Sequence, residues 1–299
     1  MRPMHDTADC EAYLSEKAKV IDAALADCLE RQKGAPDTIR QAMAYSLLGG
    51  GKRIRPALLL AANELTGGSE ERALPFACAL EIIHAYSLIH DDLPCMDNDT
   101  LRRGKPTNHV VYGDAMALLA GDALLNLAYE IMIDACVARG VGALRTAQYI
   151  AEAAGARGMI GGQSLDILST GKFTSEAELQ DMHLKKTGAI LCAAVLSGIA
   201  LNDPDDNTVE CLREYGYHLG MLFQITDDIL DCEGSVAELG KSVGKDAQES
   251  KTTYVTLYGL EKAHQLAREH AEKAEKSVNC LHDGAFFRLM AKYILNRKK

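Results

Sequence analysis

The sequence predicts an all-α protein, and three observations favour that class over a protein built on a sheet. Residues 107–203 and 205–299 contain no proline, and stretches of that length without proline favour long helices. Aromatic residues make up only 5% of the chain, whereas many-stranded sheets are enriched in aromatic and β-branched residues. Apolar residues also recur at helical spacing, as Leu212, Tyr215 and Leu219 do.

The order of the elements follows from this spacing and from the glycines, prolines and aspartates that interrupt it. We predict helices over residues 9–32, 37–48, 53–66, 71–93, 114–138, 142–170, 175–201, 206–232, 251–279 and 283–296. Loops are expected at residues 49–51, 67–68, 94–106, 202–204 and 234–246. Pro94 ends the helix before it, because proline cannot continue a helical hydrogen-bond ladder. No Ser- or Pro-rich linker divides the chain, so residues 1–299 are expected to form a single domain.

Composition and charge narrow the functional classes. The chain has 299 residues, of which 47% are hydrophobic and 25% charged, as in ordinary globular proteins. Its formal net charge of −10 argues against nucleic acid as a partner. Nine cysteines without a C-x-x-C pair indicate reduced thiols in a cytoplasmic chain. No signal peptide is evident, and the longest apolar segment, residues 189–201, is too short for a membrane span.

Two clusters of aspartates are the most informative feature. Asp91, Asp92 and Asp97 lie in the segment HDDLPCMDND, and a second trio lies in QITDDILD: Asp227, Asp228 and Asp231. Each cluster ends a strongly apolar helix, where carboxylates repel one another and lose hydration, so a cation should lie between them. Carboxylates without nearby Cys or His pairs suit Mg²⁺, which also takes phosphate oxygens as ligands. Because Pro94 interrupts the first cluster, the chain must bulge for Asp97 to return to the same ion.

Basic residues are grouped near these carboxylates. Lys52, Arg53 and Arg55 follow the glycine triplet 49–51, and Arg102, Arg103 and Lys105 follow the first aspartates. Glycines let backbone N–H groups approach a phosphate, and arginine grips its oxygens in bidentate fashion. Two other patterns are rejected: Gly240-Lys241-Ser242 lacks the first glycine of a P-loop, and the two E-x-x-H pairs of a di-iron bundle include one in a strongly charged segment, at Glu261.

Together these motifs resemble the trans isoprenyl diphosphate synthases, most closely the bacterial farnesyl diphosphate synthases. The resemblance covers residues 29–299 and includes GGGKRIRP, HDDLPCMD, RRGKPT, GGQSLD, KKTG, FQITDDILD and GKDAQESKTTY, in that order. It implies a single large bundle of mostly antiparallel helices around a central cavity, usually as a homodimer. It also implies a reaction in which isopentenyl diphosphate captures an allylic carbocation that forms when diphosphate leaves. No protein nucleophile is needed for that chemistry.

The resemblance assigns roles to particular residues. Three Mg²⁺ ions would be held by Asp91, Asp92, Asp97, Asp227, Asp228 and Asp231. Substrate diphosphates and the reacting end of the allylic chain would be bound by Gly51, Lys52, Arg55, His84, Arg102, Arg103, Lys186, Thr187, Gln224, Lys241, Lys245 and Lys251. Of these sets, the catalytic residues would be Lys186, Thr187, Gln224, Asp91 and Asp227. The isopentenyl diphosphate site within the second set would comprise Lys52, Arg55, His84 and Arg103.

Product length is expected to depend on the helix that carries Asp91. Tyr86 lies five residues before Asp91, about 7 Å back along a helix, where a ring can close a hydrophobic tunnel. In the family an aromatic residue there, with Ser87 beside it, accompanies farnesyl products; Tyr86 can alternatively be a simple core residue. A geranylgeranyl or geranyl diphosphate synthase of the same fold is the nearest alternative function. A non-catalytic partner subunit is the alternative from a different class.

Overall fold

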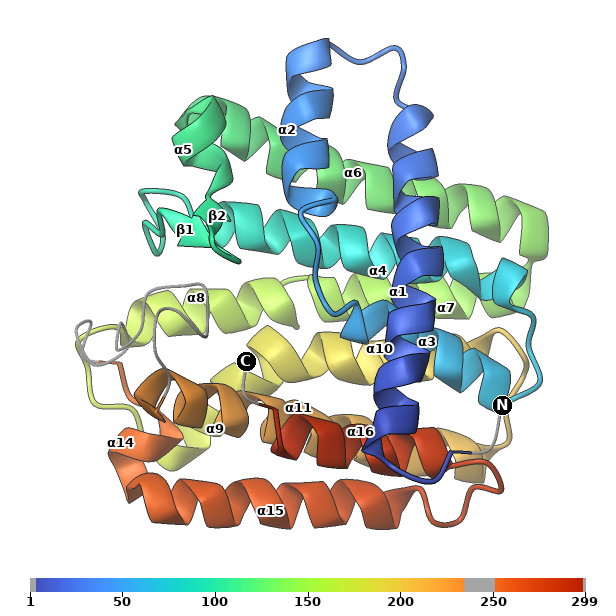
Figure 1. The fold of residues 1–299 in the computed structure, drawn as a ribbon, viewed down its shortest axis with the longest axis vertical. Helices are drawn as coiled ribbons and strands as arrows, with labels where there is room; N and C mark the ends of the chain where they lie inside the picture. The colour runs from blue at the N-terminus through green and yellow to red at the C-terminus, as the bar shows by residue number, and fades with distance from the viewer. Residues whose placement is uncertain (1–3, 234–250, 298–299) are drawn as a thin grey trace.

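A computed structural model describes residues 4–233 and 251–297 of the chain, and it confirms the all-α class (Figure 1). The first half contains α1 (Thr7–Glu30), α2 (Asp37–Leu47), α3 (Ile54–Leu65), α4 (Glu70–Asp91), β1 (Leu101–Arg102), β2 (Lys105–Pro106), α5 (Asn108–Tyr112), α6 (Asp114–Arg139) and α7 (Val141–Ala154). The second half contains α8 (Met159–Ser169), α9 (Glu176–His183), the π-helical turn η1 (Leu184–Gly188), α10 (Ala189–Ala200), α11 (Asp206–Glu233), α14 (Tyr254–Tyr258), α15 (Leu260–Ser277) and α16 (Ala285–Leu295).

The core is built around α10, which is apolar on every side. All of its residues from 193 to 200 are buried, and a helix that is hydrophobic all round needs partners on all its faces. It packs against α3, α7 and α11, while α4 packs on α6 and α11 packs on α15. In Figure 1, α1 and α2 run across these helices, and β1, β2, α8, α9 and α14 lie toward one end of the stack, at the left.

The predicted elements are recovered with local corrections. The helix predicted over 142–170 is two helices, α7 and α8, separated by a turn that contains Gly155 and Gly158. The helix predicted over 251–279 is interrupted at Gly259, whose φ of 80° ends α14. The loop predicted over 94–106 contains the two-residue strands β1 and β2, which pair in antiparallel register. Helix α5 was not predicted, and the loop expected at 234–246 lies outside the described residues.

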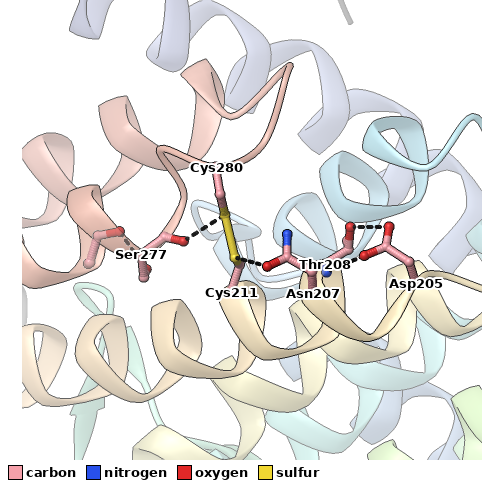
Figure 2. The surroundings of a disulfide bond; sticks show 7 residues. Asp205, Asn207, Thr208, Cys211, Ser277 and Cys280 are labelled. Atoms are coloured by element: carbon pink, nitrogen blue, oxygen red, sulfur yellow. Dashed lines mark hydrogen bonds between the residues drawn. A yellow bond between two sulfur atoms is a disulfide. The ribbon is translucent and has the colours of Figure 1, made fainter.

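One pair of cysteines contradicts the prediction of reduced thiols. Cys211 on α11 forms a disulfide with Cys280, which lies in the connection between α15 and α16 (Figure 2). The two are 69 residues apart in sequence, and they meet because α15 packs back along α11 and the chain then turns toward α16. The other seven cysteines are free thiols. The prediction is therefore wrong for this pair, because cysteine spacing in the sequence does not report which helices pack together.

Among residues 4–233 and 251–297, two helices are long and apolar enough to cross a membrane by length and composition alone. These are α4, with 67% of its apolar window buried, and α6, with 44% of its window buried. Core helices of proteins that never enter a membrane also meet this criterion, so the observation is weak in either direction. The expectation that the chain has no membrane span stays a prediction.

Candidate active site

The two aspartate clusters lie on different helices at the same end of the bundle. Asp91 is the last residue of α4, and the second cluster occupies the last two turns of α11. Asp227, Asp228 and Asp231 all line one polar cavity of about 240 Å³, and Asp97 lines it from the opposite cluster. Asp91 faces a neighbouring apolar cavity, and Asp92 lines a smaller pocket next to Arg102. Carboxylates of both clusters therefore face a common space, but Asp91 and Asp92, which the family resemblance places at the same ions, line two other pockets.

The expected bulge after Pro94 is present. The backbone N–H of Asp97 donates to the carbonyl of Asp91 at 2.9 Å, and Asn98 N donates to the carbonyl of Leu93 at 3.1 Å. These bonds fold the chain back on the end of α4 and bring the Asp97 charge near Asp91. Burial, helped by the neighbouring charges of Asp97 and Asp92, raises the pKa of Asp91 to about 6. Carboxylates gathered in this way are stabilised by a cation.

Asp92 is held differently from its neighbours. Its carboxylate accepts hydrogen bonds from the Arg102 guanidinium, with Nε at 2.9 Å and Nη2 at 2.6 Å. The β1–β2 hairpin places Arg102 there, because Arg103 and Gly104 at its tip adopt the positive φ angles of a tight hairpin turn. Burial alone would raise the pKa of Asp92, and the arginine offsets only part of that rise.

A chain of hydrogen bonds fixes the side chains on α11. The Thr187 hydroxyl donates to Gln224 Oε1 at 3.1 Å, and Gln224 Nε2 donates to Asp228 Oδ1 at 3.0 Å. The other oxygen of Asp228 accepts from the backbone N–H of Tyr254 at 2.9 Å, at the start of α14. Thr187 and Gln224 are therefore brought together, and both line the polar cavity.

Two lysines bring positive charge to the polar cavity. Lys186 Nζ donates to Asp166 Oδ2 at 2.6 Å, and Lys251 Nζ lies 3.7 Å from Asp97 Oδ1 and 3.8 Å from Asp166 Oδ2. Burial tends to raise the pKa of Asp166, but the charges of Lys186 and Lys251 hold it below its ordinary value. Burial tends to lower the pKa of Lys186, and the attraction of Asp166 and Asp91 overcomes it, so this lysine stays charged. Lys241 and Lys245 lie outside the described residues.

The position of Lys186 depends on an irregular backbone. It lies in η1, where a π-helical turn separates α9 from α10, and such turns are frequent at functional sites. Gly162 of α8 packs directly against this turn: a Cβ at Gly162 would lie 2.1 Å from the backbone nitrogen of Lys186. Gly162 of the GGQSLD segment thus lets α8 approach closely enough for Asp166 to reach Lys186.

A second positive cluster surrounds His84 on α4. Arg55 Nη1 lies 3.4 Å from His84 Nε2, and Arg103 Nη1 donates to the carbonyl of Gly50. Burial, and to a smaller degree the charges of Arg297 and Arg103, lower the pKa of Arg55. Burial and the nearby arginines lower the pKa of His84 well below its ordinary value, so the ring is neutral. Lys52 lies over the ring of Tyr293 on α16, 5.5 Å from its centroid.

An apolar cavity of about 500 Å³ adjoins both charged regions. Arg55, His84, Lys186 and Thr187 line it where it meets the charged groups, and Tyr86 and Ser87 line it on α4. Lys186 and Thr187 also line the polar cavity, so the two spaces share a wall. Tyr86 is buried, its ring meets that of His90 edge-on at 5.6 Å, and its hydroxyl has no hydrogen-bond partner among the described residues.

Sequence reasoning missed three residues at the site. Asp166 was quoted only as part of a motif, and the structure pairs it with two lysines. His183 is buried on the wall of the polar cavity, and burial lowers its pKa to about 3. Arg297, in the basic C-terminal tail after α16, donates to Asp227 Oδ1, and its guanidinium carbon lies 3.9 Å from the centroid of the Phe223 ring. Only the basic character of the tail signalled it.

Fold and site together define a helical protein that can bind a diphosphate beside an apolar chain: carboxylates and cations line one cavity, and hydrocarbon lines the next. The polyprenyl synthetase family profile matches residues 36–283, so the chain belongs to that family. It is 47% identical over 89% of its length to a geranylgeranyl pyrophosphate synthase of Capsicum annuum, of which 72% is covered.

Two further similarities concern bacterial proteins. The chain is 45% identical to the farnesyl diphosphate synthase of Geobacillus stearothermophilus, over 92% of this chain and 93% of the relative. A crystal structure of an FPP/GFPP synthase from Zymomonas mobilis superposes with a TM-score of 0.85 at 33% identity, covering 97% of this chain and 99% of the other. The resemblance inferred from the motifs is confirmed: the protein is a prenyltransferase of this family.

Proposed function

We propose that the protein is a farnesyl diphosphate synthase that condenses dimethylallyl and then geranyl diphosphate with isopentenyl diphosphate. The observation that carries the proposal is the shared wall at Lys186 and Thr187, where a charged cavity meets an apolar cavity of about 500 Å³. An allylic diphosphate placed across this wall would have its diphosphate among the cations and its hydrocarbon chain toward Tyr86. The neutral ring of His84 and the charged Arg55 would hold the second diphosphate at the other end of the apolar space.

The residues present fit Mg²⁺ as a cofactor. Within the described part of the chain no three Asp, Glu, His or Cys side chains form a metal site by themselves, and Mg²⁺ usually takes one or two carboxylates and completes its shell with water and substrate phosphate. We propose that Asp91 and Asp97 on one wall, and Asp227, Asp228 and Asp231 on the other, supply these carboxylates. Bound Mg²⁺ would act as a Lewis acid that stabilises negative charge on the departing diphosphate.

The protein's own groups would act on the same charge. Lys186 and Lys251 can turn from Asp166 to the diphosphate oxygens, and donors placed where negative charge develops lower the barrier for its departure. Thr187 Oγ1 and Gln224 Oε1 would face the allylic carbon with their lone pairs and stabilise its positive charge. Asp92 is bound to Arg102, so we propose that it contributes by orienting that arginine toward the diphosphate.

A product assay tests the proposal. Purified protein, Mg²⁺, labelled isopentenyl diphosphate and a dimethylallyl or geranyl starter should give a C15 alcohol after phosphatase treatment, resolved by reversed-phase chromatography. A C15 product formed by this protein alone, with no partner subunit added, would also reject the non-catalytic-subunit alternative. Absence of any prenyl product would refute the proposed function.

Geranylgeranyl diphosphate synthesis is a second candidate, because the Capsicum annuum relative with that name is as similar to this chain as the farnesyl synthase is. The same assay separates the two, since C20 would then be the main product.

A homodimer and a cytoplasmic location are also proposed. Exposed apolar side chains on α6 and α7, including Ile133 and Val137, support the dimer because large apolar side chains exposed on neighbouring helices favour association with another chain.

A further inference from the structure

A buried ion cluster lies behind the glycine loop and outside the substrate groups named above. Arg53, whose side chain is 1% exposed, donates from Nη1 to Glu81 Oε1 at 2.6 Å and from Nε to Asp22 Oδ1 at 2.8 Å. Its Nη2 donates to the carbonyl of Leu47, the last residue of α2, at 2.8 Å. One guanidinium therefore joins α1, α2 and α4 through three different partners.

The backbone at this point is held in an uncommon conformation. Gly50, Gly51 and Arg53 all have positive φ angles, and Arg53, at 49°, is the residue immediately before α3. A non-glycine residue in the left-handed region costs about 1 kcal/mol or more and persists only where surrounding contacts hold it. A Cβ at Gly51 would lie 2.9 Å from Arg103 Nη2, so the loop passes against that guanidinium. The contacts of Arg53, together with the hydrogen bond from Arg103 to the Gly50 carbonyl, hold this turn.

The cluster lies next to groups proposed to bind isopentenyl diphosphate. Lys52 and Arg55 flank Arg53 in the chain, and Glu81 precedes His84 by three residues, about one turn, on α4. Burial tends to lower the pKa of Arg53, but the charges of Glu81 and Asp22 raise it overall, so the guanidinium stays charged. The ion pair thus connects the segment that carries Lys52 and Arg55 to α4, the helix that carries His84.

We propose that Arg53 and Glu81 are positioning residues for the isopentenyl diphosphate site: their buried ion pair sets the distance between the segment from Lys52 to Arg55, at the start of α3, and His84 on α4. This inference rests on the proposed function. It predicts a selective effect, because the allylic diphosphate would be held by Lys186 in η1, Lys251 in the segment before α14 and Arg102 in β1, none of which is part of the Arg53–Glu81 ion pair.

The test separates positioning from stability. Removing one partner of a buried ion pair strands the other charge, whereas replacing both with apolar residues of similar size can be neutral for stability. Arg53→Met or Glu81→Met should therefore lower Tm, and the double variant Arg53→Met/Glu81→Met should regain most of the loss. In the double variant we expect KM for isopentenyl diphosphate to remain raised by roughly tenfold, the usual scale for a lost orienting contact. KM for the allylic substrate should change by less than about twofold, because mutations at distant sites without shared partners affect each other only weakly.

Two further variants complete the design. Arg53→Lys keeps the charge but loses the planar guanidinium that reaches three partners. This variant should fold and should raise KM for isopentenyl diphosphate. It tests the positioning role if the double variant does not fold. Lys17→Met is the matched control, because Lys17 is a buried lysine that joins α1 to Glu64 and Glu70 and lies outside the cavities lined by the site residues. It should lower Tm and leave both KM values unchanged.

The outcomes are distinct. An unchanged KM for isopentenyl diphosphate in the folded double variant and in Arg53→Lys would overturn the inference, and so would an equal rise in both KM values. If the unmodified protein makes no prenyl product, the proposed function fails first; if it is active and the variants keep a normal KM, only the positioning role fails.

Discussion

Replacing Tyr86 with alanine should lengthen the product by one isoprene unit. The ring lies about 7 Å behind Asp91 along α4 and lines the apolar cavity. Its removal extends the space in which a prenyl chain can lie. Burying the five carbons of an added unit is worth up to about 4 kcal/mol, at about 0.8 kcal/mol per carbon. Even half of that value, about 2 kcal/mol, would change the ratio of C20 to C15 product by roughly thirtyfold.

The assay is chromatography of dephosphorylated products from labelled isopentenyl diphosphate and a geranyl starter. Tyr86→Phe is the matched control: it keeps the ring and removes only a buried hydroxyl that has no hydrogen-bond partner among the described residues. That variant should keep the product length of the unmodified protein and its Tm, since no hydrogen bond is lost. If Tyr86→Ala is folded and gives the same product as Tyr86→Phe, the ring does not close the cavity and the reasoning is wrong.

Three further predictions concern the metal site, pH and assembly. Asp227→Asn should lower turnover by about a hundredfold or more at saturating Mg²⁺ with little change in the far-ultraviolet circular dichroism spectrum; near-normal turnover would contradict its role. Burial lowers the pKa of His270 from 6.5 to about 4, and its Nδ1 lies 3.0 Å from that of His218. Because the folded state disfavours protonation, the stability from neutral His270 is complete above about pH 6.5 and is lost as pH falls toward 4. His270→Phe should therefore flatten the dependence of Tm on pH in that window, and an unchanged slope would argue against it. Ile133→Glu, on the exposed face of α6, should halve the mass measured by sedimentation if that face joins two copies; an unchanged dimer would place the interface elsewhere.

Elements that depend on local patterning were predictable from the sequence. The long helices α4 and α11 have continuous apolar spacing. The predicted ends of both helices lie within two residues of the ends in the structure. The break between α7 and α8 was missed because Gly155 and Gly158 stand in an otherwise helical pattern, where a glycine can be either tolerated or terminal. Strands of two residues, such as β1, are too short for an alternating pattern to be recognised.

The site shows the same division between local and distant information. The aspartate clusters were predictable because their members are neighbours in sequence, so their shared need for a cation can be inferred without knowing the fold. Asp166 could not be assigned in this way, since its partners Lys186 and Lys251 lie 20 and 85 residues away. Arg297 meets Asp227 only because α16 packs against α11.

Arg53 and Arg55 show most directly where sequence reasoning reaches its limit. Both are arginines of one short basic segment, and composition gives no ground for treating them differently. In the fold, Arg53 is the residue immediately before α3 and points toward Glu81 and Asp22, where carboxylates already balance its charge. Arg55, two residues on within the first turn of α3, lies beside His84, and burial leaves its charge poorly compensated. A buried cation with matched partners stabilises a turn, whereas one without them favours an anionic ligand. The two side chains therefore point in different directions from one turn at the start of α3, and this difference separates the proposed positioning residue from the proposed binding residue.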